Sequence, residues 1–221
     1  MPGALARGNA SGGYPTGVVW PAARDSGRAR GYKRRMPTPD RELPTGPVLT
    51  LPGLWNSGTE HWQSHWERLA PAVFRRVNQR DWETPRVEDW VETLDRAAAA
   101  AGPEVLLAAH SLACALVCHW ARRTRTPVRG ALLVAPSDVE APSYPAGPAG
   151  FEPMPLDRLR FRSIAVVGDD DPYVSLPRAR AFAAAWGSRL VEVRGLGHLN
   201  SDSRMGTWPL GLSLLRELRA G

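Results

Sequence analysis

The 221-residue sequence predicts an α/β fold, in which a mainly parallel sheet of about six strands carries helices on both faces. Three observations support this prediction. Short apolar runs alternate with amphipathic segments along residues 47–221, the runs are continuously apolar, and Gly or Pro separates most of the segments. Continuous apolar runs indicate strands that are buried on both faces, as they are in a parallel sheet covered by helices.

The first apolar run, residues 47–51, predicts a buried strand because it ends abruptly at Pro52-Gly53, a typical start of a loop. Ser57 and Thr59 are N-cap candidates for a helix that continues to about Leu69. Apolar side chains recur on one face of this segment, which supports the helix.

Residues 73–78 predict a second strand and residues 104–109 a third. Between them, residues 85–101 place apolar side chains at intervals of three and four, the spacing of one helical face. Gly102-Pro103 directly follows and predicts the end of that helix.

The same alternation continues to the end of the chain. The expected elements are helix 112–123, strand 130–135, strand 161–167, helix 176–186, strand 189–193 and helix 208–218. Residues 136–155 are rich in Pro, Gly and Ser and too few for a helical cap domain. We therefore expect a minimal lid and an open site that suits small soluble substrates.

The positive charge of the chain is concentrated in residues 1–46. The formal net charge is +6, and residues 1–46 hold eight basic and three acidic residues, whereas residues 47–221 hold 20 and 19. Eight glycines and six prolines without hydrophobic periodicity predict a flexible tail before a folded domain at 47–221. A nucleic-acid-binding arm and a docking segment are alternatives. Basic blocks without interleaved aromatic residues are weak support for nucleic-acid binding. Translation that begins at Met36 would leave the body of the protein intact, so we expect an inert or mis-assigned tail and no nucleic-acid partner.

Membrane, metal and cofactor functions are not indicated. There is no run of eighteen apolar residues and no apolar segment of a secretory signal, so we expect a cytoplasmic protein without a membrane partner. Cys114 and Cys118 lie four apart without further ligands at metal-binding spacing, which favours two buried core residues in a reducing compartment. His61 and His65 are also four apart, but Trp62 replaces the glutamate of a zinc-binding helix and no third ligand is apparent. No phosphate loop or dinucleotide fingerprint occurs, and no cofactor is expected.

Ser, Asp and His residues each follow a different predicted strand. Ser111 stands at an abrupt strand-to-helix junction, with the small residues Ala109 and Ala113 two positions away on either side. This arrangement meets the steric requirement of the G-x-S-x-G nucleophile elbow without its glycines. The run Asp169–Asp171 follows the strand at 161–167 and, taken alone, fits either a cation site or a solvated turn. His198 follows the last strand in a Gly-rich loop.

The chain order Ser, Asp, His at successive strand ends is that of the catalytic triad of α/β hydrolases. It predicts an α/β-hydrolase-like domain with a serine nucleophile. In such a triad the histidine takes the serine proton and a buried carboxylate fixes the histidine tautomer. The sequence therefore predicts acyl transfer chemistry at the carboxyl ends of the strands.

Several longer motifs carry a resemblance to a known family. They are LPGLWNSG at 51–58, HWQSHW at 61–66, Trp82, DWV at 89–91, HSL at 110–112, DPY at 171–173, AWG at 185–187 and GHLN at 197–200. In these motifs the sequence resembles the small serine hydrolases of the retinoblastoma-binding-protein-9-like family, which includes bacterial YdeN proteins. The resemblance spans about residues 47–210.

This resemblance implies that Ser111 is the nucleophile, that Asp171 is the acid because it directly precedes Pro172-Tyr173, and that His198 is the general base. The family usually has glycine where this chain has Ala113.

Elbow geometry also suggests the oxyanion hole. One donor is expected to be the backbone N–H of Leu112, and the other that of Leu54, with Trp55 as the alternative. Trp55 and Asn56 are expected to line the substrate pocket. We therefore expect a carboxylesterase-like serine hydrolase that cleaves small acyl esters through an acyl-enzyme. The alternative is a non-catalytic binding or scaffold protein on an α/β-hydrolase fold.

Overall fold

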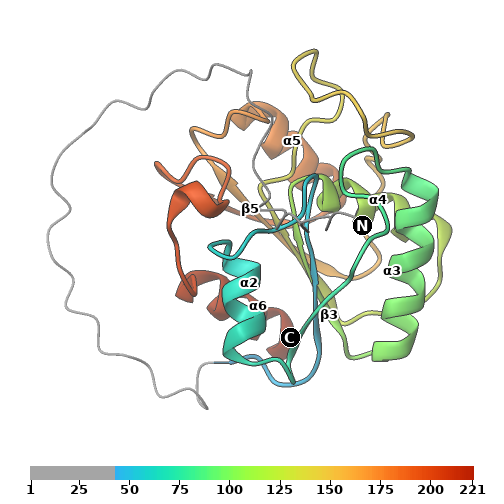
Figure 1. Cartoon of the computed structure of the whole chain (residues 1–221), viewed down its shortest axis with the longest axis vertical. Helices are drawn as coiled ribbons and strands as arrows, with labels where there is room; N and C mark the ends of the chain where they lie inside the picture. The colour runs from blue at the N-terminus through green and yellow to red at the C-terminus, as the bar shows by residue number, and fades with distance from the viewer. Residues whose placement is uncertain (1–42) are drawn as a thin grey trace, which may run out of the picture.

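The computed structural model describes residues 43–221 (Figure 1). The tail expected at residues 1–46 therefore lies outside the described residues, apart from its last four positions. Of these, Leu43 packs partly buried against the core, and Gly46 lies beside the guanidinium of Arg219. The described chain is thus already in contact with the domain at residue 43.

Six parallel strands form one sheet in the order β2-β1-β3-β4-β5-β6. The strands are β1 (Val48–Leu51), β2 (Phe74–Arg76), β3 (Leu106–His110), β4 (Gly130–Val134), β5 (Arg162–Gly168) and β6 (Arg189–Val193). The expected parallel sheet is confirmed, and all six strands begin and end within two residues of the expected bounds. β2 is three residues long, shorter than expected.

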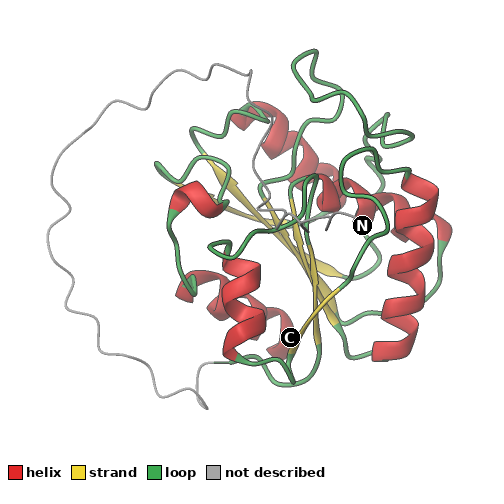
Figure 2. Ribbon diagram, in the orientation of Figure 1, coloured by secondary structure: helices red, strands yellow, loops and turns green. Residues whose placement is uncertain are grey.

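Helices cover both faces of the sheet, as expected (Figure 2). They are α2 (Trp62–Leu69), α3 (Val87–Ala101), α4 (Leu112–Arg123), α5 (Leu176–Trp186), α6 (Pro209–Ala220) and the short 3₁₀ helix η1 (Ser201–Ser203). α3, α4 and α5 pack on one face, and α2 and α6 on the other. In β3, Leu107 and Ala109 face the first layer and Leu106 and Ala108 the second. Both faces of the strands are therefore buried, which explains their continuous apolar runs. None of the helices in residues 43–221 has the length and apolar character that a membrane span requires.

The helix expected from Ser57 or Thr59 begins only at Trp62, so this start was wrong. His61 is the N-cap, and its Nδ1 accepts the backbone N–H of Gln63 at 3.2 Å. The Ser57 hydroxyl instead donates to Oε1 of Gln63 at 2.6 Å. Residues 58–60 therefore belong to a loop and not to the helix.

β1 and β3 are neighbours in the sheet, and at this point the chain reverses the direction in which it adds strands. The chain leaves β1 toward β2 on one side and returns through α3 to β3 on the other. The connections that follow these two strands therefore lead to helices on opposite faces of the sheet, α2 and α4, and ligands bind at the carboxyl ends of the strands at such a point. The side-chain amide of Gln63 stabilises this point, since its Nε2 donates to the carbonyls of Leu51 and Ala108 at 3.0 and 2.9 Å.

Residues 136–155, which we call the covering loop, contain no helix, as expected. The loop is nevertheless fixed to the domain. Phe151 and Met154 are buried in the core, and Ala149 forms a parallel bridge with Arg86. The loop also approaches the carboxyl ends of the strands, where it contributes to the site described next.

Candidate active site

Ser111 lies in a strained turn between β3 and α4. Its backbone has φ 59° and ψ −124°, a conformation that costs a non-glycine residue on the order of 1–3 kcal/mol. The turn is held by the Ser111 N–H, which donates to the carbonyl of Val134 at 3.0 Å, and by a bond from the Cys114 N–H to the Ser111 carbonyl. Ala109 and Ala113 are fully buried, so strand and helix approach each other closely. This is the geometry that exposes a nucleophile at the edge of the sheet.

The loop after β1 passes directly against this turn. A Cβ on Gly53 would lie 2.8 Å from Cβ of Ser111 and 2.9 Å from the His110 carbonyl oxygen, closer than any real Cβ contact. Glycine is therefore required at this position for the two loops to meet.

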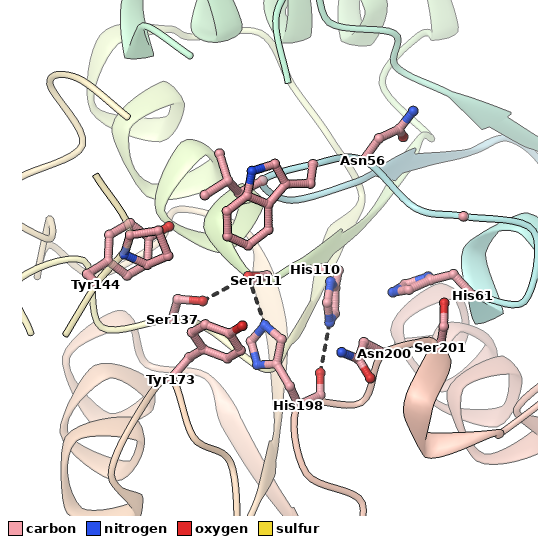
Figure 3. A pocket seen from close by; sticks show the side chains of 14 residues that line it. Asn56, His61, His110, Ser111, Ser137, Tyr144, Tyr173, His198, Asn200 and Ser201 are labelled. Atoms are coloured by element: carbon pink, nitrogen blue, oxygen red, sulfur yellow. Dashed lines mark hydrogen bonds between the residues drawn. The ribbon is translucent and has the colours of Figure 1, made fainter. Parts of the chain in front are cut away.

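A continuous hydrogen-bond chain joins Ser111, His198 and Asp171. Oγ of Ser111 lies 2.9 Å from Nε2 of His198 (Figure 3). Nδ1 of His198 lies 2.9 Å from both carboxylate oxygens of Asp171. The side chain of Asp171 is fully buried. Because a carboxylate accepts hydrogen bonds, Nδ1 carries the proton and Nε2 is free to accept the proton of Ser111. The three residues singled out from the sequence therefore meet in the arrangement that a triad requires.

The two preceding aspartates, Asp169 and Asp170, bind backbone N–H groups instead. Oδ1 of Asp169 accepts the N–H of Gly195 at 3.0 Å, and Oδ1 of Asp170 accepts the N–H of Gly197 at 2.8 Å. They fix the loop that carries His198. Among residues 43–221 no group of three or more His, Cys, Asp or Glu side chains is arranged to hold a metal ion.

Two further side chains hold the His198 loop from the opposite side. Nε2–H of His110 donates to the His198 carbonyl at 2.9 Å, and Nε1–H of Trp62 donates to the Leu199 carbonyl at 3.0 Å. His110 is buried, and this burial lowers its pKa well below the ordinary value, so its ring is neutral.

The backbone N–H groups expected to form the oxyanion hole are those of Leu112 and Leu54. Leu112 is the first residue of α4, where backbone N–H groups have no partner within the helix. Within the described part of the chain, no acceptor is found for the N–H of Leu112 or of Leu54. The N–H of Trp55, the alternative, donates to the Trp82 carbonyl at 2.8 Å. The geometry therefore favours Leu54 over Trp55.

A cavity of about 50 Å³ opens at Ser111. Trp55 and Asn56 line it, and both have a left-handed backbone, with φ of 64° and 66°. The amide oxygen of Asn56 accepts from Arg76 at 3.0 Å, and Figure 3 shows the Asn56 side chain directed away from Ser111. Asn56 therefore belongs to the cavity rim rather than to its floor.

The covering loop contributes three residues that the sequence did not single out. Tyr144 and Pro145 line the cavity, and Ser137 is buried with its Oγ 2.8 Å from Oγ of Ser111. Tyr173, which follows β5 in the DPY motif, packs its ring 4.4 Å from that of His198. The covering loop thus forms one wall of the site, which makes the site less open than its short length suggested.

The other candidate ligand groups are separated in the structure. Cys114 and Cys118 are free and buried, and burial raises the pKa of both thiols. His61 is a helix cap rather than a member of the helical face of His65, whose Nε2 lies 3.7 Å from Glu60. The expected core role of the cysteines is confirmed.

Comparisons with known proteins agree with the observed fold. A family model described as serine hydrolase matches residues 48–217. The structure of a YdeN-like hydrolase from Pectobacterium atrosepticum is 31% identical, with a TM-score of 0.70 over 79% of this chain and 90% of its own. The ydeN gene product from B. subtilis is 19% identical, with a TM-score of 0.66 over 80% of this chain and all of its own (100%).

An esterase from Thermogutta terrifontis shares the fold at 14% identity, with a TM-score of 0.60 over 80% of this chain and 92% of its own. No curated protein matches the sequence.

Proposed function

The chain belongs to the serine hydrolase family of YdeN-like and retinoblastoma-binding-protein-9-like proteins, and from this premise we propose that it hydrolyses small acyl esters. Ser111 is the nucleophile, His198 the general base and Asp171 the acid that orients it. The observation that carries the proposal is the unbroken hydrogen-bond chain from Oγ of Ser111 to the buried carboxylate of Asp171.

The reaction follows from the positions of these groups. Nε2 of His198 removes the proton of Ser111 as Oγ attacks the ester carbonyl, and Asp171 stabilises the imidazolium that forms. The N–H groups of Leu54 and Leu112 donate to the oxyanion. His198 then protonates the departing alcohol, which leaves an acyl-enzyme, and a water activated by His198 hydrolyses it. A single oxyanion donor contributes about 10²–10³ in kcat in comparable sites.

The size of the cavity supports a short acyl group. Its volume of about 50 Å³ is well below the roughly 300–1,000 Å³ of pockets that hold drug-sized ligands. The walls contributed by Tyr144 and Pro145 belong to a loop that is fixed to the core, so the cavity is not enlarged by displacing a free segment. Short acyl chains are therefore preferred over long ones.

Labelling with a fluorophosphonate probe tests the proposal. Wild-type protein is expected to react at Ser111, and the Ser111→Ala variant is expected to remain unlabelled although it folds with the same thermal midpoint. Equal labelling of the two proteins would contradict the hydrolase function and favour the non-catalytic alternative. A series of p-nitrophenyl esters then tests chain length, and a preference for long acyl chains would contradict the proposed substrate class.

A further inference from the structure

The cavity extends away from Ser111 in two directions (Figure 3). On one side Ser137, Tyr144 and Tyr173 form its wall. On the other side lie His61, Asn200 and Ser201, beyond the ring of His110. We call this second side the polar arm.

His61 presents an unused hydrogen-bond donor in the polar arm. Its side chain is 3% exposed, and burial together with the charge of Arg76 lowers its pKa to about 3, so the ring is neutral. Nδ1 accepts the Gln63 N–H, which places the single ring proton on Nε2. Nε2 is buried and has no partner among the described residues. Native proteins rarely leave a buried donor unsatisfied, so this atom indicates a missing acceptor.

Asn200 supplies a second donor to the same arm. Its Oδ1 accepts the N–H of Asp202 at 3.0 Å, where it caps η1. This bond fixes the orientation of the amide and leaves its Nδ2 as a donor. Figure 3 shows the amide nitrogen on the side of the residue that faces His110 and His198. The polar arm therefore offers two N–H donors from neutral side chains.

The position of the polar arm relative to His198 indicates which half of an ester enters it. The ring of His61 lies 4.6 Å from that of His110, which in turn lies 4.9 Å from that of His198. Tyr173, on the opposite wall, lies 4.4 Å from the ring of His198, so both sides of the cavity border the general base. The wall formed by the covering loop is the one assigned above to the acyl group, which leaves the polar arm for the other half of the ester. In ester hydrolysis the histidine must face the leaving oxygen in order to protonate it. The polar arm is therefore next to the alcohol half of the substrate.

We propose that His61 and Asn200 bind an oxygen atom in the alcohol half of the substrate, so that the preferred substrates are short-chain esters of oxygen-bearing alcohols such as glycols, glycerol or hydroxy acids. This inference rests on the proposed esterase function and adds its leaving-group specificity. A purely hydrocarbon alcohol leaves both donors unsatisfied, whereas an ether or hydroxyl oxygen accepts from them.

A pair of isosteric esters tests this specificity. 2-Methoxyethyl acetate differs from n-butyl acetate only by an ether oxygen in place of one methylene group of the alcohol. The ratio of their kcat/KM values is measured by acetate release for wild type, His61→Phe and Asn200→Asp. Asn200→Asp retains the Oδ1 cap and removes the Nδ2 donor. We expect each variant to lower the wild-type ratio about three- to tenfold, the effect of one hydrogen bond. His65→Phe, on the same segment but outside the cavity, is the matched control and should leave the ratio unchanged.

Failure of the inference is distinguishable from failure of the esterase function. If wild type hydrolyses both esters and the ratio is the same in all four proteins, the polar arm does not bind the alcohol and the inference is overturned. If wild type neither labels at Ser111 nor cleaves either ester, the esterase function itself fails. Where labelling occurs but turnover is below detection, protection from the probe by 2-methoxyethanol relative to 1-butanol gives the same comparison. Should His61→Phe fail to fold, Asn200→Asp decides the result.

Discussion

The hydroxyl of Ser137 lies 2.8 Å from the hydroxyl of Ser111, in a position where only 1% of Ser137 is exposed. Ser111 has one proton, which it directs to Nε2 of His198 when it is ready to react. Ser137 must then donate its own proton to Oγ of Ser111. Asp138 fixes this contact, because its N–H donates to the Tyr173 carbonyl and its carboxylate pairs with Arg178 at 2.9 Å. Ser137 thus orients the nucleophile.

Ser137→Ala is expected to lower kcat/KM for a short ester about three- to tenfold, since one orienting hydrogen bond is lost. Its labelling by a fluorophosphonate should slow by a similar factor. Ser143→Ala, an exposed serine of the same covering loop, should behave as wild type. A Ser137→Ala variant with unchanged rates would contradict the orienting role.

Gly53→Ala is expected to destabilise the domain by about 1–3 kcal/mol and to reduce activity, because the new Cβ meets the backbone of the nucleophile turn. Urea unfolding and ester hydrolysis measure the two effects. Gly58→Ala is the matched control for stability, since a Cβ there meets nothing within 4 Å. Equal free energies of unfolding for the two variants would count against a steric requirement at Gly53.

Replacing each of the three adjacent aspartates by asparagine in turn distinguishes their roles. Asp171→Asn is expected to lower kcat on the order of 10³–10⁴-fold, because the amide no longer enforces the tautomer of His198. In Asp169→Asn and Asp170→Asn the side-chain oxygen can still accept the glycine N–H, so losses below about tenfold are expected. Thermal midpoints of all three variants separate folding from activity. A comparable loss in Asp170→Asn would assign the acid differently.

Acidification is expected to destabilise the protein through His61 and His110. The pKa of His61 falls from its ordinary value of 6.5 to about 3 in the folded state, and burial shifts His110 in the same direction. Below pH 6.5 the unfolded chain therefore binds more protons than the folded one, and stability decreases as the pH falls toward 3. His61 alone accounts for a loss of about 2 kcal/mol between pH 7 and pH 5.

Urea unfolding at the two pH values measures this loss. His61→Phe should reduce the difference between pH 7 and pH 5, whereas His65→Phe should leave it close to that of wild type. A free energy of unfolding that is constant over this interval would rule out a buried neutral His61.

The division of the chain near residue 46 remains a prediction. Deletion of residues 1–35 is expected to leave both the thermal midpoint and the ester hydrolysis rate unchanged, because the domain from residue 47 is nearly neutral and has the length and composition of a complete core. Circular dichroism and a p-nitrophenyl acetate assay measure the two quantities. Loss of either would show that the tail is part of the folded domain.

The sheet and the meeting of Ser111, Asp171 and His198 were predictable because strand ends in a parallel sheet converge on one edge. Each of these residues follows its own apolar run, so its place after a predicted strand also indicates that it lies at this edge of the sheet. Ser137 and Tyr144 were not predictable, since they lie in a loop without periodicity and reach the site only through the packing of that loop.

Competition between neighbouring side chains for hydrogen bonds explains the other differences between the predicted and the observed structure. Ser57 is a common N-cap residue, yet its hydroxyl is bound to Gln63, and His61 caps α2 instead. The helix therefore starts later, and the i, i+4 spacing of His61 and His65 does not place them on one face. Which of three adjacent aspartates reaches His198 likewise depends on the turn after β5, where Asp169 and Asp170 are occupied by glycine N–H groups.

The covering loop is anchored along its length. Asp138 pairs with Arg178, Ala149 bridges to Arg86, and Phe151 and Met154 are buried in the core. An incoming ester therefore meets walls that are already ordered, and binding need not restrict the backbone of this loop further. Discrimination between esters then follows from the fixed shape of the cavity. A change of specificity is expected to require repacking of buried loop residues such as Phe151 and Met154 as well as substitutions in the cavity itself.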